Sequence, residues 1–302
     1  MGYLHINNLY RPEAQTVLLF KEVYALEKIH GTSTHIRFRP SDSSISYFSG
    51  GTKFAAFITL FNEDDLIARF KALNLPVDKD ITVFGEGYGG KEQGMRDTYG
   101  PELKFVAFDV KIGERWLNVP DAEDVVKKLG LEFVFYKKVS TQFVEENGVR
   151  RYVELDNERD ATSEQARRNG VVGYRKREGI VIRPPVEVTL NNNSRVIAKH
   201  KRDEFRETAS PRSIEIDPAK LKVLSDAQEV ADEWVTNERL KHVLDKIPDH
   251  SMAMIPQIIK NMTEDVLREG QGEIVESKEV KSAIGNKTVE MYKGMLKSLV
   301  GK

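Results

Sequence analysis

The chain has 302 residues, of which 40% are hydrophobic and 31% are charged, and its formal net charge is −1. This length and composition predict a globular protein with one large domain or two of ordinary size, and any surface that attracts nucleic acid must be local because the overall charge is close to zero. The absence of cysteine excludes disulfides and thiolate-bound zinc or iron–sulfur sites.

The N-terminal stretch MGYLHINNLYRPEAQ lacks the basic start and apolar core of a signal peptide. Ile6 stands where the myristoylation pattern requires Ser or Thr. No apolar run approaches the length that spans a bilayer. We therefore expect a cytoplasmic protein that does not contact a membrane.

The first two thirds of the sequence are dominated by short strand signals. One strand is expected to end at Lys28, and runs bounded by Pro, Ser and Gly predict others at 34–40, 44–50, 80–90, 103–113, 179–185 and 194–205. Apolar spacing predicts one helix over 63–75 that stops at Pro76, and a second over 122–130 followed by a strand. The charged residues 157–170 are expected to form a solvated helix with loop flanks. The pattern favours an α+β fold with antiparallel sheets.

The character of the sequence changes near residue 220. Residues 208–219 contain two prolines and few large apolar residues, which indicates a linker. Beyond it, apolar residues that include Val230, Trp234, Leu240 and Leu244 recur at roughly three- and four-residue steps until Pro248, and 255–270 and 280–300 continue in the same way. We expect one α+β domain over 1–210 and a small all-α domain over 219–302.

The first candidate for chemistry is Lys28, in the stretch EKIHG. An amine becomes a useful nucleophile when desolvation or nearby cations lower its pKa, and Gly31 after His30 would let a ligand approach the backbone. A surface lysine at a hairpin fits the same four residues. The motif by itself leaves both interpretations open.

Two further candidates follow in the next strands. Glu86 lies in the glycine-rich stretch VFGEGYGG, where its carboxylate could accept hydrogen bonds from a ribose, although a solvated loop glutamate is equally consistent. In FVAFDV, strand alternation places Phe105, Ala107 and Asp109 on one face and Phe108 on the other. Phe108 could stack on a purine or belong to the core.

The last candidates lie near the end of this region. In REGIVIRP, Glu178 precedes an alternating strand and Arg183 ends it. Lys199 and Lys201 share one face of a strand, about 7 Å apart, where they would repel each other unless an anion such as phosphate lies between them. Lysines on a solvated edge strand would also fit.

Together and in this order, these elements resemble the motif series of the covalent nucleotidyltransferases, which include polynucleotide ligases and capping enzymes. The form EKIHGTS, with His30 where DNA ligases usually have Asp, is similar to the nick-sealing, double-strand-specific ATP-dependent RNA ligases of T-even phages and trypanosome editing complexes. The resemblance covers about residues 20–206. The helical C-terminal third also suits this class, since DNA ligases and capping enzymes append a β-rich OB-fold.

The resemblance implies roles for the catalytic residues. Lys28 would attack the α-phosphorus of ATP, release pyrophosphate and hold AMP. Glu178 would bind the catalytic Mg²⁺, with Mn²⁺ as an alternative metal. Lys199 and Lys201 would contact the α-phosphate. The AMP would then pass to a 5′-phosphate, and a 3′-hydroxyl would displace it.

The resemblance also implies an ATP-binding set. Glu86 would hydrogen-bond the ribose and Phe108 would stack on adenine. The other members are the backbone near Glu27 and Ile29, which would read the adenine edge, the basic position Arg183, and His30 and Ser33 of the first motif.

This chain departs from the family pattern at two places. Ser33 stands where the family commonly has Asn. The family's arginine after the first motif has no counterpart in YFSGGTKF, where Lys53 is the nearest basic residue.

The implied partner is RNA, as a nicked duplex or an RNA–DNA hybrid, bound by a monomer in the cytoplasm, which would be the host cytoplasm if a phage encodes it. The local basic clusters Arg150–Arg151, Arg167–Arg168, 175–177 and 199–202 could contact the duplex backbone. The alternatives are a single-strand RNA ligase, a minimal DNA ligase and a catalytically silent RNA-binding relative.

Overall fold

The computed structural model describes residues 2–74, 78–146, 149–212, 214, 224–247 and 249–300. The chain divides into two compact units, Met1–Glu146 with Arg151–Arg202 and Asn147–Arg150 with Asp203–Lys302. The expected helix stops at Pro76 and Pro248, and residues 213 and 215–219 of the expected linker, lie outside the described residues.

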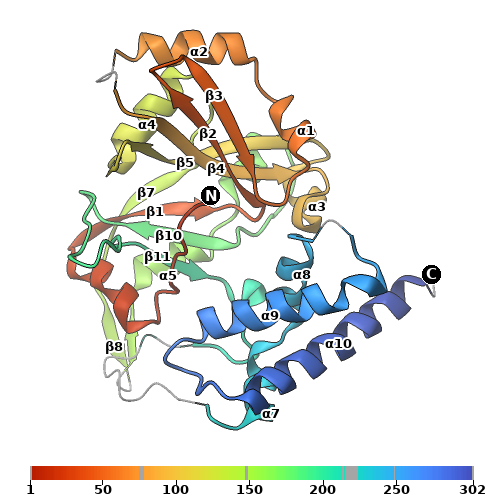
Figure 1. Ribbon diagram of the computed structural model, residues 1–302. Coiled ribbons are helices and arrows are strands. Elements are labelled where there is room, and N and C mark those ends of the chain that lie inside the picture. Colours follow the sequence, from red (N-terminus) through yellow and green to blue (C-terminus); the bar gives the residue numbers. More distant parts are fainter. Residues whose placement is uncertain are drawn as a thin grey trace. The chain divides into compact units, whose positions relative to one another are not determined.

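Two antiparallel sheets form the first unit (Figure 1). The first has the order β11-β10-β1-β7 and consists of β1 (Glu22–Lys28), β7 (Tyr136–Ser140), β10 (Gly179–Arg183) and β11 (Ala198–Lys201). The second has the order β3-β2-β4-β5-β6 and consists of β2 (Thr32–Arg39), β3 (Ser44–Ser49), β4 (Ile81–Gly89), β5 (Leu103–Ile112) and β6 (Arg115–Trp116). Two short strands, β8 (Val144–Glu146) and β9 (Val149–Arg151), come after β7.

The predicted strands are confirmed, and one of them is shorter than expected. The strand signal over 194–205 yields only the four residues of β11, followed by the 3₁₀ turn η3 (Asp203–Phe205). The predicted antiparallel arrangement is also confirmed, since every pairing within the two large sheets is antiparallel.

Helices α2 (Glu63–Ala72) and α4 (Val119–Lys128) pack on the second sheet (Figure 1). The side chain of Asn62 caps α2 by accepting a hydrogen bond from the N–H of Asp65. Phe70 of α2 stacks on Phe38 of β2 with ring centroids 4.9 Å apart. Helix α4 ends before Gly130, whose φ of +72° is the left-handed conformation typical of a helix end.

The remaining helices of this unit are short. They are η1 (Pro12–Leu19), α1 (Phe54–Ile58), η2 (Glu92–Gly94), α3 (Arg96–Tyr99), α5 (Val153–Arg159) and α6 (Glu164–Arg168). The expectation of one solvated helix over 157–170 is wrong. The segment contains only the end of α5 and the short helix α6, and Gln165 and Ala166 of α6 are buried, because α6 docks against the strand that carries Lys28.

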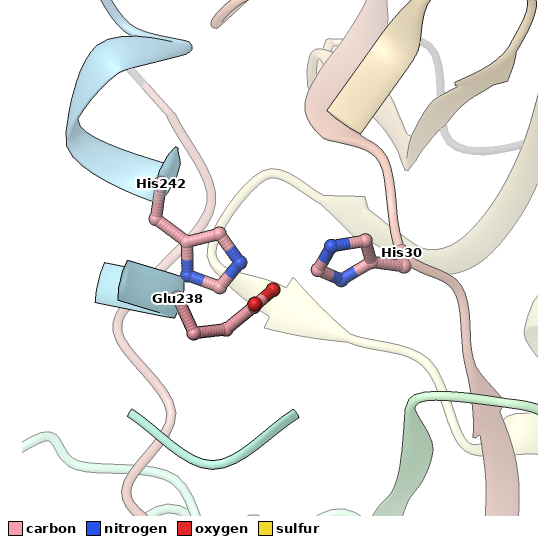
Figure 2. Close-up of side chains that lie close together, drawn as sticks. All are labelled: His30, Glu238 and His242. Carbon is pink, nitrogen blue, oxygen red and sulfur yellow. The ribbon is translucent and has the colours of Figure 1, made fainter. Parts of the chain in front are cut away.

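The described part of the second unit consists mainly of the helices α7 (Ala227–Trp234), α8 (Asn237–Leu244), α9 (Ile255–Glu269) and α10 (Lys278–Val300), with the 3₁₀ turn η5 (Met252–Met254) before α9. Val230, Trp234, Leu240 and Leu244 are all buried in its apolar core, as their spacing predicts. Glu238 and His242 lie one turn apart on the same side of α8 (Figure 2). Among the described residues, no helix has the length and apolar character needed to cross a membrane.

Candidate active site

The pairing register of the first sheet places the candidate lysines on one face. Lys28 lies opposite Gly179, and Gly179 lies opposite Lys201. Two residues further along β10, Val181 lies opposite Lys199. Because paired residues of an antiparallel sheet point to the same side, Lys28, Lys199 and Lys201 share one face although 171 residues separate Lys28 from Lys199.

Glu178 gathers three of the predicted residues around its carboxylate. Its side chain is only 1% exposed. One oxygen, Oε2, lies 2.9 Å from Lys28 Nζ and 3.0 Å from His30 Nδ1, and the other, Oε1, lies 3.0 Å from Lys201 Nζ. Burial raises the pKa of Glu178, but the charges of Lys28, Lys201 and His30 outweigh it and hold the pKa well below its ordinary value. The carboxylate is therefore an anion at neutral pH.

Lys28, which ends β1, and His30, which follows the strand, have different surroundings. Lys28 keeps 24% of its side chain exposed, so its amine can be reached from outside. His30 is buried in the stretch that leaves β1 (Figure 2), and its backbone N–H donates to the hydroxyl of Tyr99. His30 is therefore fixed through both its ring and its backbone.

Gly31 is required by packing inside the protein. A Cβ atom at this position would lie 2.4 Å from the backbone oxygen of Gly87 and 2.9 Å from Cγ of Glu86. This packing requirement is separate from the expected access of a ligand to the backbone, which stays a prediction. Gly31 lets strand β4 come close enough to bring Glu86 beside Lys28.

A cavity of about 230 Å³ lies beside this cluster, between the two sheets of the first unit. Its wall includes seven of the predicted site residues, which are Glu27, Lys28, Ile29, Ser33, Glu86, Phe108 and Arg183. The rest of the wall is mostly apolar, with Leu26, Val106, Val134, Val181 and Ile197 from the strands and nearby segments, and Tyr3, Leu4 and Ile6 from the N-terminal segment. An apolar pocket with a few polar groups is typical of a small-molecule site.

Glu86 and Ser33 face this cavity from paired positions on β4 and β2. Burial raises the pKa of Glu86 to about 8, with a smaller raising effect of Glu178 that the charge of Lys28 opposes. The buried Ser33 hydroxyl has no hydrogen-bond partner among the described residues. A buried polar atom without a partner is uncommon, so Ser33 offers a contact to a ligand.

Phe108 reaches the cavity through an irregularity in β5. The register between β4 and β5 shifts between Phe84 and Gly85, so Asp109 pairs with Phe84, Ala107 pairs with Gly85, and Phe108 is the extra residue. The predicted alternation is therefore wrong at Asp109. Its carboxylate lies on the cavity side with Phe108 and binds Tyr3 and Arg183, which both line the cavity.

The carboxylate of Glu27 faces away from solvent and holds α6. It accepts hydrogen bonds from the hydroxyl of Ser163 at 2.6 Å and from the backbone N–H groups of Glu164 and Gln165 at 2.9 and 3.2 Å. Burial raises the pKa of Glu27, and these hydrogen bonds and the charge of Arg177 oppose it. The side chain of Glu27 thus positions the end of β1, next to the nucleophile candidate.

Arg183 lines the cavity, but its guanidinium group is 1% exposed and heavily bonded. It lies 3.0 Å from Asp109, pairs with Glu187, and donates to the backbone oxygen of Leu117 at 2.6 Å. Arg177 is buried as well and donates to the oxygens of Thr162 and Glu158. The expectation that the whole cluster 175–177 faces a duplex is therefore wrong for Arg177.

A family model described as RNA ligase matches residues 21–201, which is more than half of the chain. This match includes every motif residue described above. The chain belongs to the RNA ligase family.

This chain is similar to solved structures of an RNA ligase from Naegleria gruberi. One is a lysine-to-alanine variant with ATP and Mn, at 14% identity and a TM-score of 0.50, and the match covers 68% of this chain and 57% of that one. An apo lysine-to-alanine variant gives 15% identity, a TM-score of 0.50 and the same coverage. At this identity the likeness shows a shared fold of antiparallel sheets and helices, and the chain spans just over half the length of those structures. A search of curated proteins found no match.

The candidate site also has neighbouring residues that the sequence motifs did not indicate. Arg195 lies 2.6 Å from Asp109 and 2.7 Å from Glu187, and its guanidinium lies 4.0 Å from the centroid of the Trp116 ring. Tyr3 donates its hydroxyl to the same Asp109 at 2.6 Å. The one sequence signal for this network is Arg195, an arginine next to apolar residues in the expected strand 194–205. The sequence offers no such signal for Tyr3.

Proposed function

We propose that this protein is an ATP-dependent RNA ligase that joins 3′-hydroxyl and 5′-phosphate ends through an AMP carried on Lys28. The observation that carries the proposal is the position of Lys28, whose amine is partly exposed at the wall of the cavity and lies 2.9 Å from the buried Glu178. The ATP and Mn bound by the Naegleria enzyme support ATP and a divalent metal as the cofactors here.

Lys28 is the proposed nucleophile. Its Nζ would attack as the neutral amine and form a bond to the α-phosphorus of ATP while the bond from that phosphorus to the pyrophosphate oxygen breaks. Pyrophosphate would leave, and the proton lost from Nζ would pass to water. The carboxylate of Glu178 is within hydrogen-bond distance of Nζ. Such a transfer depends mainly on positioning and on neutralising charge.

Glu178 is the proposed ligand for Mg²⁺ or Mn²⁺. The residues fit a divalent cation, because a carboxylate held as an anion is the ligand these metals prefer, and Mg²⁺ commonly uses one or two carboxylates together with phosphate oxygens. The metal would neutralise charge on the phosphates. Lys199 and Lys201 come from the same sheet face as Lys28 and would contact the α-phosphate.

The cavity is the proposed site for the adenosine. Phe108 would stack on adenine, with the backbone near Glu27 and Ile29 at its edge. Glu86 would bind the ribose, and the free hydroxyl of Ser33 supports a polar contact beside it. We propose that Arg183 serves the nucleotide site as part of the cavity wall, where its ion pairs with Asp109 and Glu187 hold it in place.

We propose nicks in duplex RNA or in an RNA–DNA hybrid as the substrate, with His30 as the residue that favours RNA ligases over DNA ligases. We further propose that residues 1–210 are the adenylyltransferase domain, that 219–302 are a helical domain, and that the enzyme acts as a cytoplasmic monomer. The intact Lys28–Glu178–Lys201 cluster argues against a catalytically silent relative.

Sealing rates on matched substrates test the substrate class. We expect the fastest sealing on a nicked RNA duplex or a nicked hybrid with a 5′-phosphate, and much slower joining of single-stranded RNA. Preferred joining of single strands would make the protein a single-strand RNA ligase, and sealing of nicked DNA alone would make it a minimal DNA ligase. A nick without the 5′-phosphate is the control.

A further inference from the structure

The loop between α6 and β10 carries two exposed apolar side chains close to the proposed catalytic cluster. Val172 is 87% exposed and Tyr174 is 58% exposed. Gly170 and Gly173 have φ values of +76° and +91°, so the chain bends at each of them. Single exposed apolar residues are common, and exposure alone therefore assigns nothing.

The loop is held firmly on the protein. The backbone oxygen of Arg175 accepts from the N–H of Ser163 at 2.7 Å, and Lys176 forms a bridge with Thr162. The guanidinium of Arg175 donates to the oxygen of Asp97 at 2.8 Å. The ring of Tyr174 is thus presented from a fixed backbone.

Hydrogen bonds connect this loop to the Glu178 cluster at two places. Arg202 donates to the hydroxyl of Tyr174 at 3.3 Å, and its own N–H donates to the backbone oxygen of Glu178 at 2.9 Å. On the other side, Asp97 belongs to the helix of Tyr99, whose hydroxyl accepts from the N–H of His30. Arg202 thus connects Tyr174 to Glu178, and α3 connects the same loop to His30.

The charges around Tyr174 are mostly positive. Arg202 donates to the hydroxyl of Tyr174, and Arg175 and Lys176 follow this tyrosine directly in the chain. Arg175 and Arg202 also donate to the backbone oxygens of Asp97 and Asp160, respectively. The carboxylate of Asp160 is bound by Arg159. An aromatic ring among arginines and a lysine suits an RNA strand, because a base can stack on the ring while its phosphates meet the cations.

We propose that Tyr174 stacks on a nucleobase of the RNA substrate near the reacting end, with Arg175 and Arg202 beside the strand's phosphates. This inference rests on the proposed function and adds the place where the RNA is held. A stacked base is worth about 1–3 kcal/mol by alanine substitution, which corresponds to roughly a 5- to 150-fold change in Kd.

The test measures the Kd of full-length protein for a fluorescent nicked RNA duplex by anisotropy. Tyr174→Ala should weaken binding about 5- to 150-fold, whereas Tyr174→Phe should stay within about twofold because the ring remains. Leu19→Ala removes another exposed apolar side chain, 83% exposed, and should leave the Kd unchanged. The ratio between Tyr174→Ala and wild type should persist at raised salt, since stacking releases few counterions.

Labelling with ATP carrying ³²P on the α-phosphate is measured on the same samples. This step takes no RNA, so it reports separately whether the nucleotide site works. Equal Kd values for Tyr174→Ala and wild type, with both proteins labelled, would overturn the inference and leave the proposed function intact. Wild-type protein that neither takes the label nor binds RNA would instead contradict the proposed function.

Discussion

At the scale of single residues, Gly31 determines how closely β4 packs against the segment that follows Lys28. Gly31 leaves no room for a Cβ atom, since the nearest atom would be a backbone oxygen at 2.4 Å. Glu86 lies at the same contact and faces the cavity with Lys28. The first motif is therefore shaped by packing as well as by chemistry.

Substitution of this glycine should separate the strands. We expect Gly31→Ala to lower the free energy of unfolding by about 1–3 kcal/mol, because a backbone oxygen cannot rotate out of the way. It should also reduce AMP labelling, since Glu86 and Lys28 would move apart. Gly294→Ala is the matched control, because nothing lies within 4 Å of that position in α10, and it should keep or slightly raise stability. Unchanged stability and labelling in Gly31→Ala would contradict this account.

Glu86 should make stability depend on pH. Its pKa rises from 4.5 in the unfolded chain to about 8 in the fold. Between these values the folded protein keeps a proton that the unfolded chain has lost, so stability falls as pH rises, by an amount on the order of a few kcal/mol. Melting temperatures of Glu86→Gln and wild type are compared without nucleotide or metal. The value for the variant minus the value for the wild type should increase from pH 5 to pH 8. A difference that is the same at both pH values would refute this assignment.

At the scale of elements, the strand that ends in Lys28 is held by a helix rather than by its neighbouring strands alone. The carboxylate of Glu27 binds the start of α6 through three hydrogen bonds, from Ser163, Glu164 and Gln165. These hydrogen bonds tie α6 to β1, although more than 130 residues separate the two elements in the sequence.

Glu27→Gln tests this connection. The new amide nitrogen cannot accept the hydrogen bonds that a carboxylate oxygen accepts, so we expect a loss of about 1–3 kcal/mol in the free energy of unfolding, measured with denaturant. Glu164→Gln alters a neighbouring glutamate whose ion pair with Arg167 lies at the surface, and it should cost less than about 1 kcal/mol. Equal losses in the two variants would show that Glu27 does not hold the helix.

The sequence predicted the elements, because strand and helix periods are local signals, and the motif order pointed to seven residues that line one cavity. It also predicted that Lys28, Glu178 and Lys201 act together, and the sheet register explains their meeting. The bulge at Phe108 and the burial of Arg177 were not predictable, since a strand pattern does not show where an extra residue sits or which arginine turns inward. Tyr3 was missed because its role exists only through a partner 106 residues away.

At the scale of the whole molecule, the proposed chemistry belongs to one of the two units. Every residue that lines the cavity, and all members of the Glu178 cluster, lie within the first unit. The second unit has an apolar core of its own. The unit that holds the cavity should therefore support the first step of the reaction.

A fragment of residues 1–210 should show this. We expect it to fold, by circular dichroism, and to take the α-phosphate label from ATP to an extent comparable with the full chain, because no cavity residue is removed. Its sealing of nicked RNA should fall at least tenfold if the helical domain helps to hold the duplex. A fragment that folds but takes no label would contradict the assignment of the nucleotide site to this unit.

The most direct test of the central claim is the covalent attachment of AMP to Lys28. The full-length protein is incubated with ATP labelled on the α-phosphate and with Mg²⁺, and the label on the protein is measured after denaturation. We predict stable label on the wild type, loss of the label on Lys28→Ala, and retention of the label on Lys53→Ala, which changes a lysine outside the cavity wall. Wild-type protein without label, or Lys28→Ala protein that still carries it, would contradict the account.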